Sequence, residues 1–283
     1  MIEPPDPAVI RKAAARALGE DLGPADITTL ACVKFNIMAS ARIFAKEACV
    51  LAGMPVAGQV FREQDIALIL TALKEDGATL QPGDSVLEIR GPAASILTAE
   101  RCALNFLQQL SGVATQTRRF VEAVAGTKTR ILDTRKTVPG LRALQKYAVR
   151  CGGGTNHRFG LYDRFLIKDN HLALMGTGNR LAEAVRAARA LDPETVLEVE
   201  VDHLAQIPEI IALGVDVLLL DNMSLEEMRA CVSLIAGRAA TEASGNMTLE
   251  RVPEVARTGV DFISVGALTH SVRAIDFSLE MIA

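Results

Sequence analysis

Basic side chains are concentrated in the middle of the chain. Residues 128–168 hold ten lysines and arginines but only two aspartates, whereas the whole chain of 283 residues has a formal net charge of −4. A local basic stretch in an acidic protein indicates a small anionic ligand more than a long polyanion. The charges at residues 141–150 are expected on a helix, where a solvent-exposed face explains them equally well. The others need a separate explanation.

One basic motif directly follows an apolar segment. The motif DTRKT at residues 133–137 comes after RIL at residues 130–132, and Pro139-Gly140 precede a predicted helix. A polar turn between a strand and a helix start can bind a phosphate or a carboxylate. An arginine there offers a two-pronged guanidinium, and a lysine offers a point charge. The alternative is an ordinary surface turn.

Two further segments place basic residues in unusual surroundings. The loop CGGGTNHR at residues 151–158 has three consecutive glycines. They either let backbone amides approach an anion or form a flexible connector. The segment FLIKDNH at residues 165–171 places Lys168 in or at the end of an apolar strand, where a charge must be paired or functional. Lys168 could bind an anion, form a Schiff base, or pair with Asp169.

Carboxylates occur in or after the later strands. Glu198, Glu200 and Asp202 alternate with apolar residues, so a strand would place all three on one face. Three acids on one face need cations, a metal or sugar hydroxyls as partners. Asp221 follows the apolar run VLLL in a similar way. Together with the basic stretch, these acids suit a ligand with both hydroxyls and anions, such as a magnesium-bound phosphorylated sugar.

These motifs fall within a regular alternation of strands and helices. From about residue 127, five predicted helices separate six strand candidates, RILDT, DRFLIKD, TVLEVEV, VDVLLLD, AATEAS and DFISVG. Such alternation predicts βαβ units and a parallel sheet. Polar groups end nearly every strand, and a closed barrel gathers all of these ends at one mouth. An open sheet would use mainly those at its switch point. The sequence therefore favours an α/β barrel.

The first third of the chain has a different pattern. A helix is predicted at residues 7–18, followed by short strands around one helix between residues 39 and 90. The segment AERCALNFLQQL at residues 99–110 predicts an amphipathic helix that bridges the two halves. This part of the chain therefore reads as a small α/β domain.

Composition limits the class of protein. Aromatic residues are few, with nine Phe, two Tyr and no Trp, and the net charge is negative, which argues against nucleic-acid binding. The five cysteines form no CxxC pair and are expected as free thiols in a reducing cytoplasm. The N-terminus lacks the pattern of a signal peptide, and no apolar run approaches the length of a membrane span. We expect a soluble cytoplasmic protein without a membrane partner.

Several stretches together resemble the quinolinate phosphoribosyltransferase family. They span residues 17–271 and are ALGEDLGPADITT, TAERCALNFLQQLSGVAT, DTRKTVPGLRALQKYAVRCGGGTNHRFGLYDRFLIKDNH, LEVEVD, LLLDNMS, TEASGN and GVDFISVGALTHS. The resemblance implies that the substrates are quinolinate and phosphoribosyl pyrophosphate. The products would be nicotinate mononucleotide, pyrophosphate and carbon dioxide, with Mg²⁺ as cofactor, in de novo NAD synthesis.

The resemblance also implies the architecture. It predicts an N-terminal α/β sandwich at residues 1–108, to which residues 272–283 return, and an incomplete, roughly seven-stranded TIM-like α/β barrel at residues 109–271. It implies a homodimer with the active site at the subunit interface, where the N-terminal domain of one subunit covers the barrel mouth of the other. Arg101 matches the arginine that is donated across the dimer to quinolinate.

Roles for individual residues follow from the same resemblance. Lys136 matches the lysine between the two substrates. Glu200 and Asp221 match carboxylates near the ribose hydroxyls and, indirectly, the metal; with Lys136 they are the expected catalytic residues. The expected substrate-binding residues are Arg101, Thr134, Arg135, Lys136, His157, Arg158, Lys168, Glu200, Asp221, Ser244, Gly245, Asn246, Val265, Gly266 and Ala267. Arg164 stands where we expect a small or apolar residue.

Three alternatives stay open on the sequence. A ModD-like pyrophosphorylase homologue with a different substrate would share the DTRKT-like and GGG-HR segments, although IKDNH follows the quinolinate pattern. A Schiff-base aldolase or lyase would use Lys168. A non-enzymatic nucleic-acid binder would use the basic stretch at residues 128–168.

Overall fold

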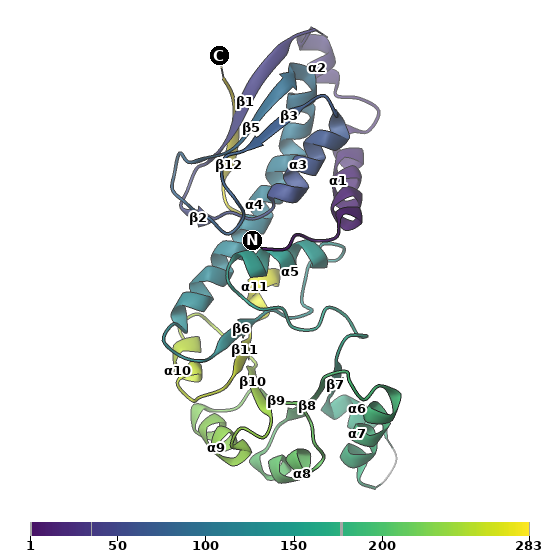
Figure 1. Ribbon diagram of the computed structural model, residues 1–283, viewed down its shortest axis with the longest axis vertical. Helices are drawn as coiled ribbons and strands as arrows, with labels where there is room; N and C mark the ends of the chain where they lie inside the picture. The colour runs from purple at the N-terminus through teal and green to yellow at the C-terminus, as the bar shows by residue number, and fades with distance from the viewer. Residues whose placement is uncertain (1, 35, 176–177, 283) are drawn as a thin grey trace. The chain divides into compact units, whose positions relative to one another are not determined.

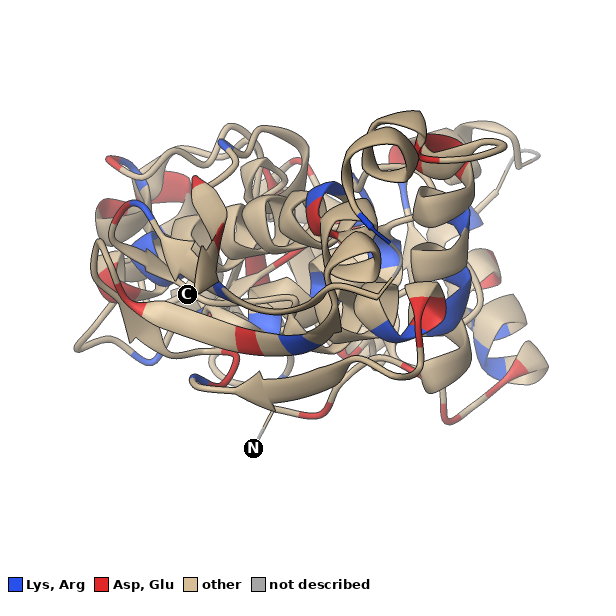
Figure 2. Ribbon diagram, turned by 90° about the horizontal axis from the view of Figure 1, so that it is seen from above, with Lys and Arg blue, Asp and Glu red and all other residues tan. Residues whose placement is uncertain are grey.

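The computed structural model describes residues 2–34, 36–175 and 178–282, and it divides into two units. The first unit contains Met1–Arg118, Thr137–Gly153 and Ser271–Ala283, and the second contains Arg119–Lys136 and Gly154–His270. Basic and acidic residues are interspersed along the ribbon (Figure 2). Among the described helices, none is both long and apolar enough to cross a membrane.

A parallel sheet of six strands forms the centre of the second unit (Figure 1). Its strands are β6 (Arg130–Leu132), β7 (Phe165–Ile167), β8 (Leu197–Val201), β9 (Val217–Asp221), β10 (Ala240–Ser244) and β11 (Phe262–Ser264). They are the six segments that the sequence predicted. The strands are rich in Val, Ile and Leu because both faces of the sheet are covered.

The strand order shows how this sheet curls. The order is β6-β11-β10-β9-β8-β7, so the first strand lies beside the last, without the reversal of a doubly wound sheet. Leu132 of β6 also bridges Thr155 in parallel, which adds the start of a further strand beside β6. Pairing of the first strand with the last is the arrangement of a barrel. The expected incomplete α/β barrel is therefore confirmed.

Short helices connect the strands of the second unit. They are α6 (Asp169–Ala173), α7 (Arg180–Leu191), η1 (Leu204–Gln206), α8 (Ile207–Ala212), α9 (Leu225–Ile235), α10 (Val252–Ala256) and α11 (Ala267–His270). Local sequence sets their starts: Ser224 and Glu227 form a capping box at α9, and Asn179 accepts the Ala182 amide at α7. The helix predicted at residues 141–150 forms as α5 (Arg142–Cys151), but it groups with the first unit.

The first unit is an antiparallel sheet covered by helices. Strands β1 (Met38–Ala45), β3 (Ile69–Ala72), β5 (Ser85–Pro92) and β12 (Phe277–Ile282) pair in the order β12-β1-β5-β3, and β2 (Cys49–Val50) pairs with β4 (Thr79–Leu80). The helices are α1 (Pro7–Leu22), α2 (Ile27–Cys32), α3 (Met54–Gln64) and α4 (Ala93–Ala123). Alternate residues of β1, such as Ile43, pack with Phe61 of α3 and Leu104 of α4 in one core (Figure 1).

The C-terminal residues pair with the first unit, because β12 lies beside β1. The boundary expected after residue 108 falls inside α4, and residues 137–153 group with the first unit. The domain limits expected from the sequence stay a prediction.

Packing of the parallel sheet yields a stability prediction. Leu218 lies within β9 and is fully buried, whereas Leu234 on α9 is 39% exposed. We expect Leu218→Ala to lower the free energy of unfolding by about 2–5 kcal/mol, because it removes a buried side chain and leaves a cavity. Leu234→Ala is the matched control, with an expected loss under about 1 kcal/mol. Urea titration of both variants measures the difference, and equal losses would contradict the assigned packing of β9.

Candidate active site

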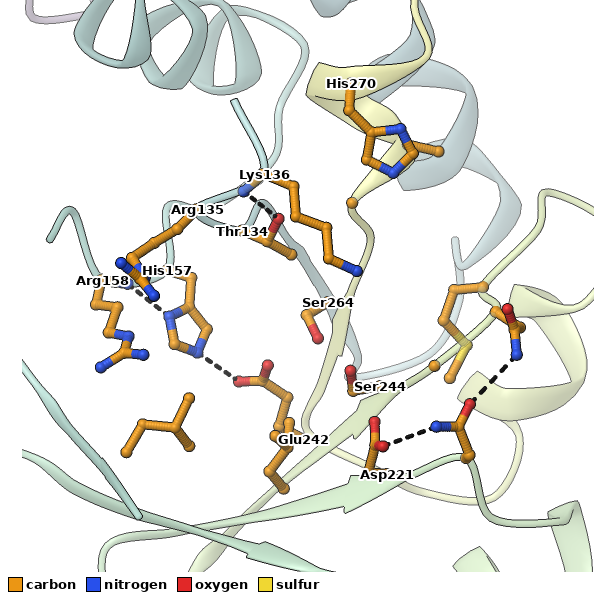
Figure 3. Close-up of a pocket in the computed structure, with 18 of the residues that line it drawn as sticks. Thr134, Arg135, Lys136, His157, Arg158, Asp221, Glu242, Ser244, Ser264 and His270 are labelled. Atoms are coloured by element: carbon orange, nitrogen blue, oxygen red, sulfur yellow. Dashed lines mark hydrogen bonds and ion pairs between the residues drawn. The ribbon is translucent and has the colours of Figure 1, made fainter. Parts of the chain in front are cut away.

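One cavity of about 680 Å³ lies at the carboxyl ends of the parallel strands (Figure 3). All of the residues that line it belong to the second unit. Twelve of the sequence-predicted site residues are among them: Thr134, Arg135, Lys136, His157, Arg158, Lys168, Asp221, Ser244, Gly245, Asn246, Gly266 and Ala267. The barrel topology thus brings together segments that are more than 100 residues apart in the sequence.

Three predicted residues are placed elsewhere. Arg101 is exposed on α4 and belongs to the first unit. Val265 is buried just after β11, where its amide donates to Leu132. Glu200 lies at the end of β8 as an ion-pair partner of Lys168 and does not line the cavity. Their expected roles stay predictions.

A buried aspartate joins the two basic loops. Asp133 directly follows β6 and is fully buried. Its carboxylate accepts the main-chain amide of His157 at 2.8 Å and the side-chain amide of Asn156 at 2.7 Å. The DTRKT loop and the GGGTNHR loop are therefore tied together at their bases, which sets Arg135 beside Arg158 (Figure 3). Burial and the charge of Arg135 lower the pKa of Arg158, although a guanidinium stays charged at neutral pH.

Lys136 is positioned from the opposite side of the cavity. The hydroxyl of Thr269 donates to the Lys136 carbonyl at 2.7 Å, and the Lys136 amide donates to Thr134 at 3.0 Å. A side chain on Gly266 would come within 3.0 Å of both the Lys136 stem and the His270 ring. A glycine at position 266 therefore lets the lysine extend into the cavity, as Figure 3 shows.

Lys168 forms an ion pair with Glu200 of the neighbouring strand β8. The partner considered from the sequence, Asp169, is wrong, because Asp169 begins α6 and its carboxylate accepts the Asn170 amide. Parallel pairing of β7 and β8 places the end of one strand beside the end of the other. The proximity of Lys168 to Glu200 thus depends on strand order, which sequence neighbours do not reveal.

Inside the barrel, His157 lies between two buried glutamates. Its Nε2 is 3.2 Å from Glu198 and 3.3 Å from Glu242, and these carboxylate side chains are 0% and 2% exposed. Arg164 also donates to Glu198, at 3.3 Å. Burial lowers the pKa of His157, but hydrogen bonds to the two glutamates outweigh it and raise it to about 9. Burial likewise favours neutral glutamates, yet the His157 bond and Arg164 lower the pKa of Glu198.

The net shift of the Glu242 pKa is opposite to that of Glu198. Its surroundings raise its pKa, chiefly through burial, and the nearby charge of Glu198 adds to the effect. Two adjacent carboxylates that share one imidazole cannot both lose their protons cheaply. The cluster of His157, Glu198 and Glu242 therefore favours the protonated form of Glu242 over that of Glu198.

The same three residues are also the one group of at least three candidate metal-binding side chains found among the described residues. Their ligand atoms lie within 4.8 Å of one another. However, Nε2 of His157 faces both carboxylates, and hydrogen bonds to them favour a proton on this nitrogen, since they raise the pKa of the ring. A metal-bound imidazole has its lone pair toward the metal and its proton on the other nitrogen. The cluster therefore suits a proton better than a metal ion.

Asp221 is oriented by the loop that follows β9. The Asn222 side chain donates to Asp221 at 2.7 Å, and Asn246 donates to Asn222 at 3.3 Å. Arg251 donates to the carbonyls of Gly245 and Met223, which joins this loop to the loop after β10. Carboxylate, amide and backbone groups at these strand ends can bind hydroxyls and phosphate oxygens.

The sequence did not identify several residues of this cavity as site residues. They are Leu166, Leu219, Asn222, Glu242, Met247, Thr248, Ser264 and His270. Glu242 had a detectable signal, because a lone carboxylate stands in the middle of a strand expected to be covered on both faces. Leu166 and Leu219 had none, since an apolar residue in a core strand is ordinary.

The close packing of the loops after β9 and β10 predicts that two glycine substitutions lower the free energy of unfolding by different amounts. Gly245 has φ of +93°, and an added Cβ would overlap the Asn222 side chain, whereas Gly237 has φ of +74° with nothing within 4 Å. Left-handed backbone is expected to cost Gly237→Ala about 1–2 kcal/mol of unfolding free energy. Gly245→Ala is expected to lose roughly 1–3 kcal/mol more through the overlap. Urea titration compares the two, and equal losses would disprove the close contact with Asn222.

Comparison with known proteins identifies the family. The model for the quinolinate phosphoribosyl transferase N-terminal domain matches residues 26–111, and the model for its C-terminal domain matches residues 113–280. Nicotinate-nucleotide pyrophosphorylase [carboxylating] of Mycobacterium leprae is 46% identical over 274 residues, covering 94% of this chain and 95% of that protein. The probable enzyme of the same name from Bacillus subtilis is 43% identical, covering 93% of this chain and 90% of that protein.

Solved structures agree with this result. The nicotinate-nucleotide pyrophosphorylase of Francisella tularensis has a TM-score of 0.95 and 41% sequence identity, covering 100% of this chain and 99% of that one. Sequence models and fold thus match over nearly the full length. The chain belongs to the quinolinate phosphoribosyltransferase family.

Proposed function

We propose that this protein forms nicotinate mononucleotide from quinolinate and phosphoribosyl pyrophosphate, with release of pyrophosphate and carbon dioxide, in NAD biosynthesis. It is then a pentosyltransferase. The observation that carries the proposal is a single cavity with a basic side and a polar side. Arg135, His157, Arg158 and Lys168 supply the basic side, while Asp221, Ser244 and Gly245 lie on the polar side.

The basic side suits the two adjacent carboxylates of quinolinate. Arg135 and Arg158 lie side by side at the base of the two joined loops (Figure 3). Guanidinium groups bind carboxylates through paired, charge-assisted hydrogen bonds, each contributing roughly 1.5–3 kcal/mol. Several such bonds overcome the cost of taking a dianion out of water. We assign quinolinate to this side.

The polar side suits the ribose and phosphate groups. Asp221 is held by Asn222, so its carboxylate has a defined position for ribose hydroxyls. Ser244 and Gly245 follow β10, and Gly266 follows β11, where backbone amides of late barrel loops commonly bind phosphate. Lys136 extends between the two sides, which supports its assignment between the two substrates (Figure 3).

To form the bond between quinolinate and ribose, the protein has mainly to position the two substrates and to balance the charges that develop. As the bond from ribose C1 to pyrophosphate breaks, positive charge develops at C1, which the Asp221 carboxylate stabilises. Lys136 neutralises charge on the departing pyrophosphate. The pyridine nitrogen of quinolinate forms the new bond to C1. The ring becomes cationic and accepts the electron pair that the 2-carboxylate leaves behind when carbon dioxide departs.

Magnesium is the proposed cofactor. Mg²⁺ prefers oxygen ligands and keeps several waters, and it usually reaches such sites on substrate phosphates with one or two protein carboxylates nearby. The Asp221 carboxylate on the cavity wall fits this donor set. We assign Asp221 as an indirect contact. The expected indirect contact of Glu200 stays a prediction, because Glu200 pairs with Lys168 and does not line the cavity. The bound ion would supply further charge neutralisation for the pyrophosphate.

The active unit is proposed to be a cytoplasmic homodimer. Arg101 is exposed on α4 of the first unit, which leaves its guanidinium accessible to a second copy of the chain. The five free cysteines suit a reducing compartment. A Schiff-base lyase is not favoured, because the Lys168 amine is engaged by Glu200, and a charged amine is not a nucleophile.

The central test is pyrophosphate release by the purified protein. We expect release only when quinolinate, phosphoribosyl pyrophosphate and Mg²⁺ are all present, with nicotinate mononucleotide as the second product. Lys136→Ala should lower turnover at least about tenfold, because one charge-assisted contact to the transition state is lost. Lys12→Ala on exposed α1 is the matched control and should retain the parent rate. Release that does not require quinolinate would reject the proposal.

Sharing of the site between subunits can be tested by mixing two inactive variants. Arg101→Ala and Lys136→Ala are each expected to be strongly impaired. After subunit exchange, half of the dimers contain both variants, and each has one intact site, so activity should recover to about a quarter of the parent level. A mixture that stays as inactive as its components would show that Arg101 does not act across the dimer.

A further inference from the structure

The proposed reaction requires a proton that none of its substrates supplies at the right atom. When carbon dioxide leaves, the bond from ring C2 to the carboxylate carbon breaks, and its electron pair stays on C2 beside the cationic nitrogen. Nicotinate mononucleotide carries hydrogen at that carbon. One proton must therefore be delivered to C2 for each turnover, in a cavity where the other groups are assigned to holding anions.

We propose that the buried carboxyl group of Glu242 donates this proton to C2, which makes Glu242 a further catalytic residue. The inference rests on the proposed function. The proton leaves the Glu242 oxygen, the electron pair on C2 forms the new C–H bond, and Glu242 becomes a carboxylate. Solvent then returns a proton to the cluster of His157, Glu198 and Glu242, so that the balance closes without any other reactant.

The position of Glu242 supports this role. It lies on β10, two residues before Ser244, and its side chain lines the same cavity as Arg135 and Lys136. Figure 3 shows its carboxyl group facing the His157 ring, on the basic side of the cavity assigned to the quinolinate carboxylates. A donor at this place is close to the carboxylate that departs.

The surroundings of Glu242 favour its protonated form. Its neighbours in register on β9 and β11, Leu219 and Phe262, are apolar and provide no charge to stabilise a carboxylate. The polar groups around it are His157, Glu198 and Ser264, with Arg164 directed at Glu198 rather than at Glu242. Glu198 has the arginine and stays ionised, which further opposes ionisation of Glu242. Of the two carboxyl groups, Glu242 is thus the one suited to carry the proton that C2 needs.

The charge of the quinolinate 2-carboxylate controls when Glu242 gives up its proton. While quinolinate holds its 2-carboxylate, the cavity contains one more negative charge, which favours the protonated form of Glu242. Loss of carbon dioxide transfers that negative charge to C2, which becomes a strongly basic carbon. The proton transfer becomes favourable only after decarboxylation, because a neutral acid then faces a strong base.

The test separates the two stages of the reaction. In single-turnover rapid-quench experiments, pyrophosphate reports transfer of the phosphoribosyl group, and nicotinate mononucleotide reports completion. We expect Glu242→Gln, which keeps the shape but has no acidic proton, to release pyrophosphate within threefold of the parent rate. Nicotinate mononucleotide should form at least about 100-fold more slowly, which is the usual contribution of a general acid. Glu242→Asp should recover part of that second rate.

A matched surface substitution and a folding check serve as controls for this experiment. Glu254→Gln, on the exposed surface of α10, is the matched substitution and should leave both rates unchanged. Thermal unfolding of Glu242→Gln verifies that it folds. If its two products still appear together, at the parent rate or equally reduced, Glu242 is not the donor. If the parent protein itself fails to release pyrophosphate with both substrates, the proposed function is wrong, and this role is lost with it.

Discussion

Pairing of β6 with β11 is the contact on which the rest of the second unit depends. Because the first parallel strand lies beside the last, residues in or just after five strands, all but β8, line one cavity. Residues near position 134 thereby meet residues near position 266, which the chain alone would leave far apart. An open sheet of the same strands would distribute these side chains along an edge. The barrel is thus a condition for the chemistry as well as a scaffold.

Buried carboxylates balance the cations without occupying the places where a ligand would bind. The Asp133 carboxylate accepts the His157 amide and thereby joins the two basic loops. Glu200 forms an ion pair with Lys168, and Glu198 forms one with Arg164. Each lies at the end of a strand or within it, where the backbone is rigid. Cations that would repel one another in isolation are therefore fixed at short range. A dianionic ligand completes the charge balance from the open side.

Local sequence patterns predicted the strands and helices better than the contacts between them. Alternating apolar segments and helices indicated the six strands, and the polar groups at their ends indicated a barrel mouth, because both signals lie within a few residues of each other. The ion pair between Lys168 and Glu200 was not predicted, and Asp169 was the only ion-pair partner considered, since the choice depends on which strand lies beside β7. The three acids of residues 198–202 were expected on one face, yet Glu198 is fully buried and Asp202 is exposed beyond the strand end.

The sequence by itself determined the residue types of the site, their order along the chain and, through several long motifs, the family. It also determined the strands, because short segments bounded by polar residues and turns alternate with segments of helical length and pattern. Only the tertiary structure decided which charges meet, why the pKa of Glu242 is raised while that of Glu198 is lowered, and which twelve expected residues share one cavity. The reason is physical: burial and distance between charges are properties of packing, and packing joins residues that have no relation in the chain.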